Sequence, residues 1–442
     1  MEKKYFKVHF VGIGGIGISA LARYYITQGW KVSGSDIALS DITKDLEALG
    51  AEIYAGSRSL KEIMPSLVVY SPAVKQGDPE LEEARRLDIR VASYPQALGE
   101  LTKKCKTIAV SGAHGKSTTT TMIALMMVDA KLDPTVIVGT KVREFGDSNF
   151  RLGKSENLVI EACEYDRSFL NYWPQVAVVT NIEMDHMECY RGEARLLAAF
   201  KEFVSHVPVM GTLVAYAGDK NSARIAKEIK KTGVNVCEYS LASPDAKKVR
   251  GLMKIPGEHN VANALAALAV GRLFKIPDSK IFASLAKYKG SWRRFDESTG
   301  TVNGKKVTLV SDYGHHPTQI KLTMEAARAK WPQKKIICVF QPHQAYRTYL
   351  LFDEFVKALK NSPADLVILA DIYQVASRER PSITKRVSSK KLAKAVGKKN
   401  VEYVATGQIM ERLDKEVSGG EVVLVMGAGN IYDLSKKISG KN

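Results

Sequence analysis

The sequence predicts an α/β protein of three successive units, each a parallel β-sheet covered by helices. Short apolar runs alternate with helical patterns along almost the whole chain, which is typical of this class. The length of 442 residues agrees, because domains of roughly 150 residues would give about three. A charged fraction of 25% and a hydrophobic fraction of 45% exclude a disordered chain, a collagen and a small disulfide scaffold.

Basic residues outnumber acidic ones, at 65 against 47, so the formal net charge is +18. This excess suits nucleic acid, a membrane surface or anionic small molecules, and it is also compatible with a solvated surface that has no specific partner. The run Lys385–Lys399 holds seven basic residues and no acidic one. We interpret that run as a solvated helix face rather than a nucleic-acid patch.

The chain carries the features of a cytoplasmic protein. Residues 1–15 lack the long apolar segment and the cleavage site of a signal peptide. The longest apolar runs are too short for membrane insertion. The five cysteines, an odd number without a CxxC pair, argue against a disulfide framework or a zinc site, and we expect reduced thiols.

The first unit is predicted from strands at residues 5–13, 30–36 and 67–72, with helices at residues 16–28 and 80–86. A glycine-rich loop joins the first strand to the first helix. Such glycines let the backbone approach a diphosphate at the helix N-terminus, and Asp36 is placed to accept a hydrogen bond from a ribose hydroxyl. A tight turn that needs glycine only for packing is the alternative. The glycines are Gly12, Gly14, Gly15 and Gly17.

The second unit begins with a strand at residues 106–112 and continues through strands at 134–139, 157–163, 176–182 and 212–218. The loop after its first strand has the sequence GAHGKS, two residues shorter than the general GxxxxGK[ST] pattern. In this loop Lys116 would reach the β- and γ-phosphates of a nucleoside triphosphate, and Ser117 would coordinate Mg²⁺. The loop residues are Gly112, Ala113, His114, Gly115, Lys116, Ser117 and Thr118.

Polar residues follow the next strands of the second unit. Glu161 and Glu164 end one strand and His186 follows another, so all should lie at the sheet edge that carries Lys116. Glu161 and His186 could be metal ligands, with structural roles as the alternative. Asn260 and Asn263 share one face of a predicted helix and could recognise adenine, although Asn260 could instead cap the helix.

The third unit begins near Thr299 and includes strands at residues 305–314, 334–343, 365–373 and 421–429. Arg293 and Arg294 precede it. An arginine at this join could neutralise a transferring γ-phosphate, whereas a solvated linker charge is the alternative for Arg293.

Taken together, these segments resemble the Mur ligase family of peptidoglycan synthesis. The matching segments run in the family's order from about residue 9 to 430, and DYGHHPT with FQPH…RT resembles the alanine-adding branch. The resemblance implies a Rossmann-like UDP-binding domain at 1–101, a central P-loop ATPase domain at 102–298 and a C-terminal Rossmann-like domain at 299–442. The segments are GIGGIG, GAHGKSTTT, EACEYDRSFL, TNIEMDH, GEHNVANALAA, WRRFD, SDYGHHPTQI and FQPHQAYRT.

The resemblance also implies the reaction. ATP would phosphorylate the lactyl carboxylate of UDP-N-acetylmuramate, and the amine of L-alanine would attack the acyl phosphate. The cofactors would be ATP and Mg²⁺, with no nucleic-acid partner, in a monomer or homodimer.

The same resemblance implies roles for individual residues. It assigns the catalytic roles to Lys116, His186, Arg294 and His316, and the Mg²⁺ ligands to Ser117, Glu161 and His186. ATP would also contact residues 112–118, which we call the phosphate loop, and Asn260, Asn263, Arg294 and Asp312. The two other substrates would contact the first glycine loop, Asp36, Ser71, Pro72, Glu164, His315, His316, His343 and Arg347.

Some positions depart from the family's pattern. Gln344 stands where an arginine is common, and residues 374–379 replace a segment of small residues, so serine or glycine could take the place of alanine. Lys201 lies where some members carry a carbamylated lysine, with an unmodified, solvent-facing helix lysine as the alternative.

Other functions leave part of the sequence unexplained. A recycling ligase that adds a whole tripeptide would need a wider amine pocket, and the FQPHQAYRT segment argues against it. An NAD-dependent oxidoreductase would not need the GKSTT loop. A nucleic-acid-binding ATPase lacks any RRM, KH or helix-turn-helix signature.

Overall fold

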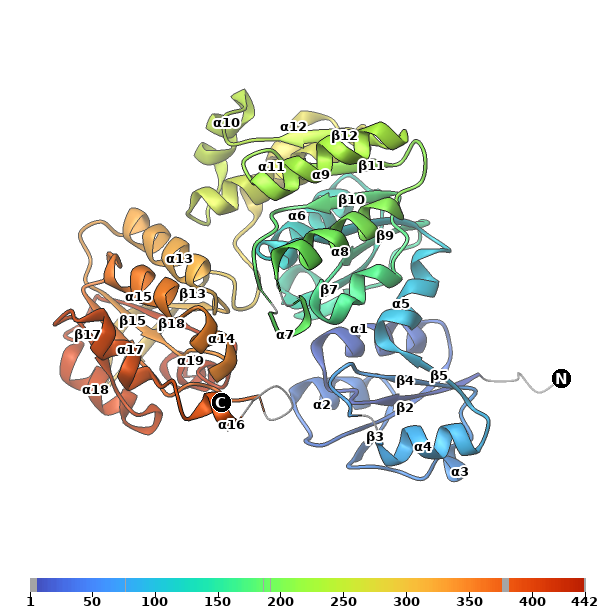
Figure 1. Cartoon of the computed structure of the whole chain (residues 1–442), viewed down its shortest axis with the longest axis horizontal. Helices are drawn as coiled ribbons and strands as arrows, with labels where there is room; N and C mark the ends of the chain where they lie inside the picture. Colours follow the sequence, from blue (N-terminus) through green and yellow to red (C-terminus); the bar gives the residue numbers. More distant parts are fainter. Residues whose placement is uncertain (1–5, 76, 186, 191, 376–380, 441–442) are drawn as a thin grey trace. The chain divides into compact units, whose positions relative to one another are not determined.

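The computed structural model describes residues 6–75, 77–185, 187–190, 192–375 and 381–440, and Figure 1 shows their helices and strands. Within these residues the strands form three sheets, of five, seven and six strands. The chain packs into two compact units: the N-terminal unit is Met1–Val249 with Ala262–Ala286, and the C-terminal unit is Arg250–Val261 with Lys287–Asn442. The predicted α/β class with three sheets is confirmed, whereas the domain bounds 1–101, 102–298 and 299–442 stay a prediction.

The first sheet is parallel, with the strand order β3-β2-β1-β4-β5. The order reverses between β1 and β4, so the loops after these two strands border the crevice where such sheets bind ligands. The elements are β1 (Lys7–Val11), α1 (Ile16–Thr27), β2 (Lys31–Asp36), α2 (Asp41–Ala48), β3 (Glu52–Ala55), α3 (Leu60–Ile63), β4 (Leu67–Tyr70), α4 (Pro79–Arg86), β5 (Arg90–Ser93) and α5 (Tyr94–Thr102).

Helix α1, which follows the first glycine loop, contacts both the first and the second sheet. Its buried Leu21 joins Val8 and Phe10 of β1 in the core of the first sheet. Its first turn is bound by Asn149, whose Nδ2 donates to Ser19 Oγ at 3.0 Å. The position of the glycine loop therefore depends on the second sheet as well as on the first.

The second sheet has the order β12-β11-β10-β6-β9-β7-β8, and all its pairs are parallel except β7 with β8. Strand β6 lies between β9 and β10, so the loop after β6 is flanked by the ends of both. The elements are β6 (Lys106–Ser111), α6 (Lys116–Asp129), β7 (Thr135–Val142), η1 (Arg143–Phe145), β8 (Ser148–Arg151), β9 (Asn157–Glu161), η2 (Tyr165–Asn171), β10 (Val176–Val179), α7 (Met187–Tyr190), α8 (Glu193–Ser205), β11 (Thr212–Tyr216), α9 (Lys220–Ile229), η3 (Lys230–Thr232), β12 (Asn235–Tyr239), α10 (Pro244–Leu252), α11 (Glu258–Leu273) and α12 (Asp278–Lys287).

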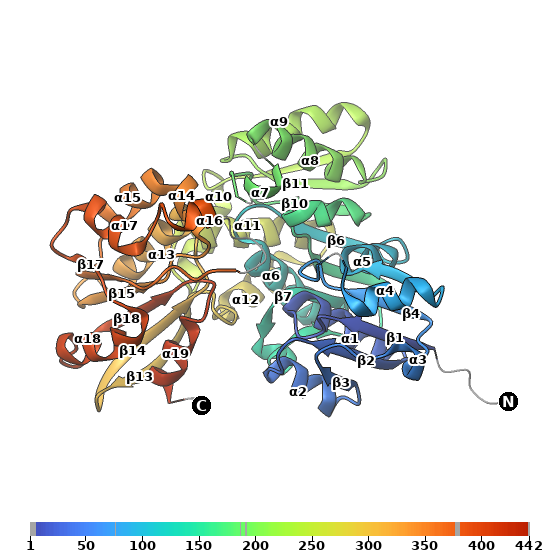
Figure 2. The ribbon, with the colours of Figure 1, turned by 60° about the horizontal axis from the view of Figure 1, so that its bottom comes forward.

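The third sheet has the order β13-β14-β18-β15-β16-β17, with an antiparallel β13–β14 hairpin followed by parallel pairs. Figure 2 shows α19 beside this hairpin, where buried Ile438 packs into the core. None of the described helices has the length and apolar character needed to cross a membrane. The elements are β13 (Asp296–Val302), β14 (Lys305–Asp312), α13 (Pro317–Lys330), β15 (Ile336–Phe340), α14 (Ala345–Leu350), α15 (Phe352–Lys360), β16 (Leu366–Leu369), α16 (Pro381–Thr384), α17 (Ser389–Val396), β17 (Val401–Tyr403), η4 (Thr406–Gln408), α18 (Ile409–Glu416), β18 (Val422–Met426) and α19 (Tyr432–Ser439).

Candidate active site

The phosphate loop lies where the sequence predicts it, between buried strand β6 and helix α6. Gly112 and Gly115 adopt positive φ angles of 138° and 83°, a region that side chains other than glycine rarely enter. Helix α6 begins at Lys116 without a side-chain cap, so the backbone N–H groups of its first turn have no side-chain acceptor at Gly115. The loop thus has the geometry of an anion-binding helix N-terminus.

The ammonium group of Lys116 lies folded back over this loop. Its Nζ donates to the carbonyl of Gly112 at 2.5 Å and forms an ion pair with Glu164 Oε2 at 2.9 Å. Burial is the largest single influence and would lower the pKa of Lys116, but the charges of neighbouring groups, Glu164 foremost, and the hydrogen bond to Glu164 together raise it. Lys116 is therefore fully charged at neutral pH, as a phosphate ligand requires.

Glu164 is the partner that fixes this lysine. Its side chain is only 2% exposed, and its backbone carbonyl accepts a hydrogen bond from the hydroxyl of Tyr190. The sequence placed Glu164 among substrate contacts, and the structure shows that its carboxylate is engaged with Lys116. The neighbouring thiol of Cys163 is buried, which raises its pKa to about 12 and keeps it protonated.

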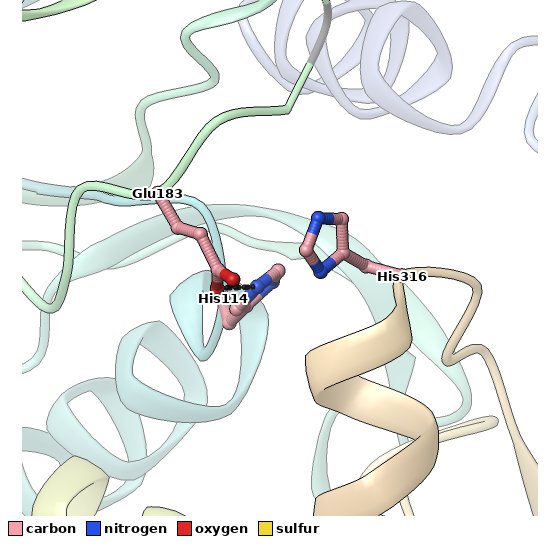
Figure 3. Close-up of side chains that lie close together, drawn as sticks. All are labelled: His114, Glu183 and His316. Carbon is pink, nitrogen blue, oxygen red and sulfur yellow. Dashed lines mark hydrogen bonds and ion pairs between the residues drawn. The ribbon is translucent and has the colours of Figure 1, made fainter. Parts of the chain in front are cut away.

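Strand β10 braces the other side of the phosphate loop. The backbone N–H of His114 donates to Asn181 Oδ1 at 2.9 Å, and Thr180 Oγ1 donates to the carbonyl of His114 at 2.6 Å. The imidazole Nε2 of His114 lies 2.7 Å from Glu183 Oε2, a pair visible in Figure 3. These contacts join two segments almost 70 residues apart, since Asn181 follows His114 by 67 positions.

The carboxylates predicted near the phosphate loop do lie at its sheet edge. In the β6–β9 pairing Val110 is opposite Glu161, and in the β6–β10 pairing Ser111 is opposite Val179. Glu161 Oε2 accepts a hydrogen bond from the backbone N–H of Gly139 at 2.8 Å. Ser117 is buried in the first turn of α6. The third predicted Mg²⁺ ligand, His186, lies outside the described residues.

The two asparagines of α11 have different surroundings. Asn263 lies against the phosphate loop, because a Cβ atom at Gly115 would come within 2.3 Å of its Oδ1. Asn260 is the third residue of the helix, and its Nδ2 donates to the carbonyl of Pro256 at 2.7 Å. Asn260 thus lies within the first turn of α11, whereas an N-cap residue precedes the helix, so its position does not fit the capping alternative.

Asp36, the acid predicted at the end of β2, forms a hydrogen bond with the first glycine loop. Gly14 donates its backbone N–H to Asp36 Oδ2 at 2.8 Å, and Gly12 adopts a φ of 78°. A Cβ atom at Gly12 would lie 3.1 Å from that of Ser71, so the loops after β1 and β4 meet closely. Asp36 thus holds the loop in addition to any contact with a ribose. Pro72, another predicted substrate contact, follows Ser71 in the loop after β4.

A buried polar network behind this crevice escaped the sequence analysis. His9 on β1 is fully buried and lies 3.1 Å from Glu80 Oε1, while Glu80 Oε2 accepts from Ser35 Oγ at 2.5 Å. Burial would raise the pKa of Glu80, but the hydrogen bonds from His9, Ser35 and the N–H of Arg58 lower it overall. The sequence carried no signal for this pairing beyond a histidine in an apolar strand.

In the C-terminal unit, Asp312 and Arg294 lie near each other at the end of β14. Asp312 accepts the backbone N–H groups of Phe295 and Gly314, at 2.9 and 2.8 Å. Burial raises the pKa of Asp312, and these hydrogen bonds with the charge of Arg294 oppose the rise. The Arg294 guanidinium lies over the ring of Tyr313, 4.7 Å from its centroid. Arg293 is only 6% exposed, so the alternative of a solvated linker charge is wrong.

The histidines that we predicted to contact the substrates lie close together, at the ends of β14 and β15. His315 Nδ1 lies 3.0 Å from the carbonyl of Tyr313, and its ring is 5.7 Å from that of His343. Arg347 is buried and its Nη1 donates to the carbonyl of His343 at 3.4 Å. His316 caps α13 through Nδ1, which accepts the N–H of Thr318 at 3.3 Å; Figure 3 labels it at the start of that helix.

The structure shows the surroundings of Gln344 and Lys201, whose roles the sequence left open. Gln344 is 1% exposed and has a φ of 68°. Lys201 has a 41% exposed side chain that pairs with Glu228 at 2.6 Å, which agrees with an unmodified helix lysine. Of the departing segment 374–379, residues 376–379 lie outside the described residues. In the run Lys385–Lys399 all seven basic residues are exposed, as a solvated face predicts, while Leu392 and Val396 are buried.

Comparison with known families decides the relationship. Profiles of the Mur ligase family match three stretches: the catalytic domain at residues 7–105, the middle domain at 110–252 and the glutamate ligase domain at 293–429. The chain belongs to the Mur ligase family.

Individual relatives match this Mur ligase over its whole length. UDP-N-acetylmuramate–L-alanine ligase of Clostridium tetani is 40% identical, with 96% of both chains covered. The enzyme of the same name from Geobacter sulfurreducens is 38% identical, covering 100% of this chain and 98% of the relative. The crystal structure of UDP-N-acetylmuramate–alanine ligase from Thermotoga maritima has a TM-score of 0.79 at 26% identity, over 98% of both chains. A murein peptide ligase from Psychrobacter arcticus has a TM-score of 0.71 at 22% identity and shares the fold.

Proposed function

We propose that this Mur ligase joins L-alanine to the lactyl carboxylate of UDP-N-acetylmuramate and converts ATP to ADP and phosphate. Full-length similarity to the alanine ligases of Clostridium tetani and Geobacter sulfurreducens carries the choice of substrates. The charged Lys116 in a glycine loop at a helix N-terminus supports the use of ATP. We expect the enzyme to act in the cytoplasm, where ATP and the UDP-linked substrate occur.

The reaction has two steps whose atoms balance. A carboxylate oxygen of the lactyl group attacks the γ-phosphorus, and the bond to the ADP oxygen breaks. The alanine amine then attacks the carboxyl carbon of the acyl phosphate, phosphate leaves, and the amine nitrogen loses a proton. Phosphoryl transfer asks for positioning and charge stabilisation rather than covalent chemistry from the protein.

The residues at the phosphate loop suit that demand. Lys116 places a buried positive charge where phosphate oxygens would lie, and α6 offers the backbone N–H groups of its first turn. Ser117 and Glu161 provide the hard oxygen donors that Mg²⁺ prefers, so the residues fit this ion. When bound, Mg²⁺ would neutralise charge on the phosphate oxygens. In the C-terminal unit, Arg294 and Asp312 are the proposed contacts to the γ-phosphate and to ATP.

We propose that the first glycine loop, with Asp36 and the Ser71 loop, binds the UDP moiety. The contact between Gly14 and Asp36 holds the loop so that its backbone can approach a diphosphate. His315, His316, His343 and Arg347 are the proposed contacts to the reacting carboxylate and the amino acid. The +18 charge agrees with two anionic nucleotides and a carboxylate as ligands.

A recycling ligase that adds a tripeptide is the alternative within the family. Among solved structures, the alanine ligase of Thermotoga maritima has a TM-score of 0.79 at 26% identity, against 0.71 at 22% for the murein peptide ligase of Psychrobacter arcticus. The full-length relatives at 38–40% identity are also named alanine ligases, so we favour the single amino acid. Gln344 is buried next to His343, one of the proposed amino-acid contacts, so serine and glycine are the competitors to measure against alanine.

The decisive experiment measures phosphate release with ATP, Mg²⁺ and UDP-N-acetylmuramate, while alanine, serine, glycine or the tripeptide is supplied separately. We expect release that depends on alanine. Lys116→Ala should reduce turnover about a hundredfold or more, because it removes the positive charge that would stabilise the phosphate during transfer. Lys390→Ala, at an exposed lysine of helix α17, is the control and should keep full activity. Release that requires the tripeptide, or no amino acid at all, would overturn the proposal.

A further inference from the structure

The side chain of Arg293 lies among three aromatic rings inside the C-terminal unit, an arrangement we call the aromatic box. Its guanidinium carbon lies 5.5 Å from the ring centroid of Trp292 and 4.9 Å from those of Tyr313 and Tyr432. Trp292 and Tyr432 are themselves joined, since the indole Nε1 donates to the tyrosine hydroxyl at 2.8 Å. Three aromatic faces around one cation form a site that fits the planar guanidinium.

The polar contacts of Arg293 tie together segments that are distant in sequence. Its Nη2 donates to the carbonyls of Gly427 and Gly429, in the loop between β18 and α19. Its own backbone carbonyl accepts the N–H of Tyr313, just after β14, at 2.8 Å. One residue therefore connects the 291–296 segment with the ends of two neighbouring strands of the third sheet.

The energetics of this arrangement argue against a role in stability alone. Among the described residues the guanidinium group of Arg293 forms no ion pair with a carboxylate, and its Nε makes no hydrogen bond. Its backbone N–H, by contrast, donates to Asp296 Oδ2 at 3.4 Å. Its φ of 55° adds backbone strain. A buried, unpaired cation costs free energy, and a well-packed apolar side chain of similar volume is often no less stabilising. An unfavourable choice held by so many specific contacts indicates a functional requirement.

The neighbours of Arg293 show what that requirement is. Arg294 follows it directly, and both guanidinium groups lie over the same ring of Tyr313, at 4.9 and 4.7 Å. Phe295, the next residue, donates its N–H to Asp312 at 2.9 Å. The position of Arg293 therefore determines the positions of Arg294 and Asp312, which are the proposed contacts to ATP.

We propose that Arg293 is a positioning residue, which acts on phosphoryl transfer by holding Arg294 and Asp312 in place. The proposal rests on the proposed function only through the role given to Arg294. Lysine could keep the positive charge at this site, but it cannot donate as a planar fork or stack on the rings as arginine does. The side-chain geometry, rather than the charge alone, is what the site selects.

The test is a double-mutant cycle of Arg293→Lys and Arg294→Lys, with kcat and each KM measured. Arg293→Lys should lower kcat about tenfold to a hundredfold, because a displacement near 1 Å has that effect on positioned groups. The KM for UDP-N-acetylmuramate should stay unchanged. In the Arg294→Lys background the same change should lower kcat less than about threefold, since it acts through Arg294.

The matched control is Arg328→Lys, at an arginine of α13 that also donates to backbone carbonyls, those of Pro363 and Lys334. It should lower the thermal midpoint without lowering kcat. If Arg293→Lys does not fold, Tyr432→Leu removes one face of the box and leaves the contact of Arg294 with Tyr313. A wild-type kcat in the folded variant, or equal effects of Arg293→Lys in both backgrounds, would overturn the proposal. Wild-type enzyme without alanine-dependent release would instead contradict the proposed function.

Discussion

At the scale of single residues, the phosphate loop depends on glycines for two separate reasons. Gly115 has a positive φ of 83°, and a methyl group there would also come within 2.3 Å of Asn263 Oδ1. Gly29 has a similar φ of 78°, but nothing lies within 4 Å of a Cβ built on it. The two positions separate the effect of backbone strain from the effect of steric contact.

Gly115→Ala should therefore be more harmful than Gly29→Ala. We expect Gly29→Ala to lower the free energy of unfolding by about 1 kcal/mol, the cost of a strained backbone. Gly115→Ala should lower it further and reduce ATP-dependent phosphate release at least about tenfold, because Asn263 and the loop must shift. Urea unfolding and the release assay measure both effects. Equal behaviour of the two variants would show that steric contact with Asn263 is unimportant.

At the scale of elements, helix α4 is joined to the first sheet by charge as well as by apolar packing. Glu80 of α4 contacts His9 of β1, Ser35 of β2 and the backbone N–H of Arg58. These groups come from four separate segments, so the carboxylate connects the helix to the sheet interior. Its exposed neighbour Glu82 pairs with Arg85 on the other face of the same helix.

This network predicts a pH-dependent stability. The pKa of Glu80 is lowered from 4.5 in the folded state, so its stabilisation is complete above about pH 4.5 and is lost as pH falls through the lower value. Glu80→Gln should cost about 1–3 kcal/mol at pH 7, with a smaller difference from wild type in acid. Urea unfolding at a series of pH values measures it, with Glu82→Gln as the control. A cost independent of pH would contradict the ionised state.

At the scale of the whole molecule, the two glycine loops lie on different sheets, after β1 and after β6. Each loop has its own bracing contacts: Asp36 for the first, and Thr180, Asn181 and Glu164 for the second. We therefore expect the two nucleotides to bind at separable sites of one chain.

Ligand-induced stabilisation should show this separation. At a hundredfold excess over Kd, each ligand should add about 2.7 kcal/mol to the stability of the wild-type protein. Lys116→Ala should lose the thermal shift caused by ATP with Mg²⁺ and keep the shift caused by UDP-N-acetylmuramate. Asp36→Ala should do the reverse. Differential scanning fluorimetry measures both, and loss of both shifts in either variant would argue against independent sites.

The amino-acid sequence alone determined the α/β class, the two glycine loops and the acids at strand ends. These features are local: a strand, a glycine turn and a helix start lie within about 20 consecutive residues, and the ends of parallel strands share an edge. Lys116, Asp36 and Glu161 could therefore be placed before any coordinates were known.

Only the tertiary structure decided which side chains these residues meet. Glu164 pairs with Lys116 across 48 positions, Glu80 reaches His9 across 71, and Arg293 reaches Gly427 across 134. Such partners are brought together by strand order and helix packing, which residue spacing does not encode. Burial then sets their charge and role: Arg293, one of two adjacent arginines in the sequence, becomes the anchored one because three aromatic rings close around it.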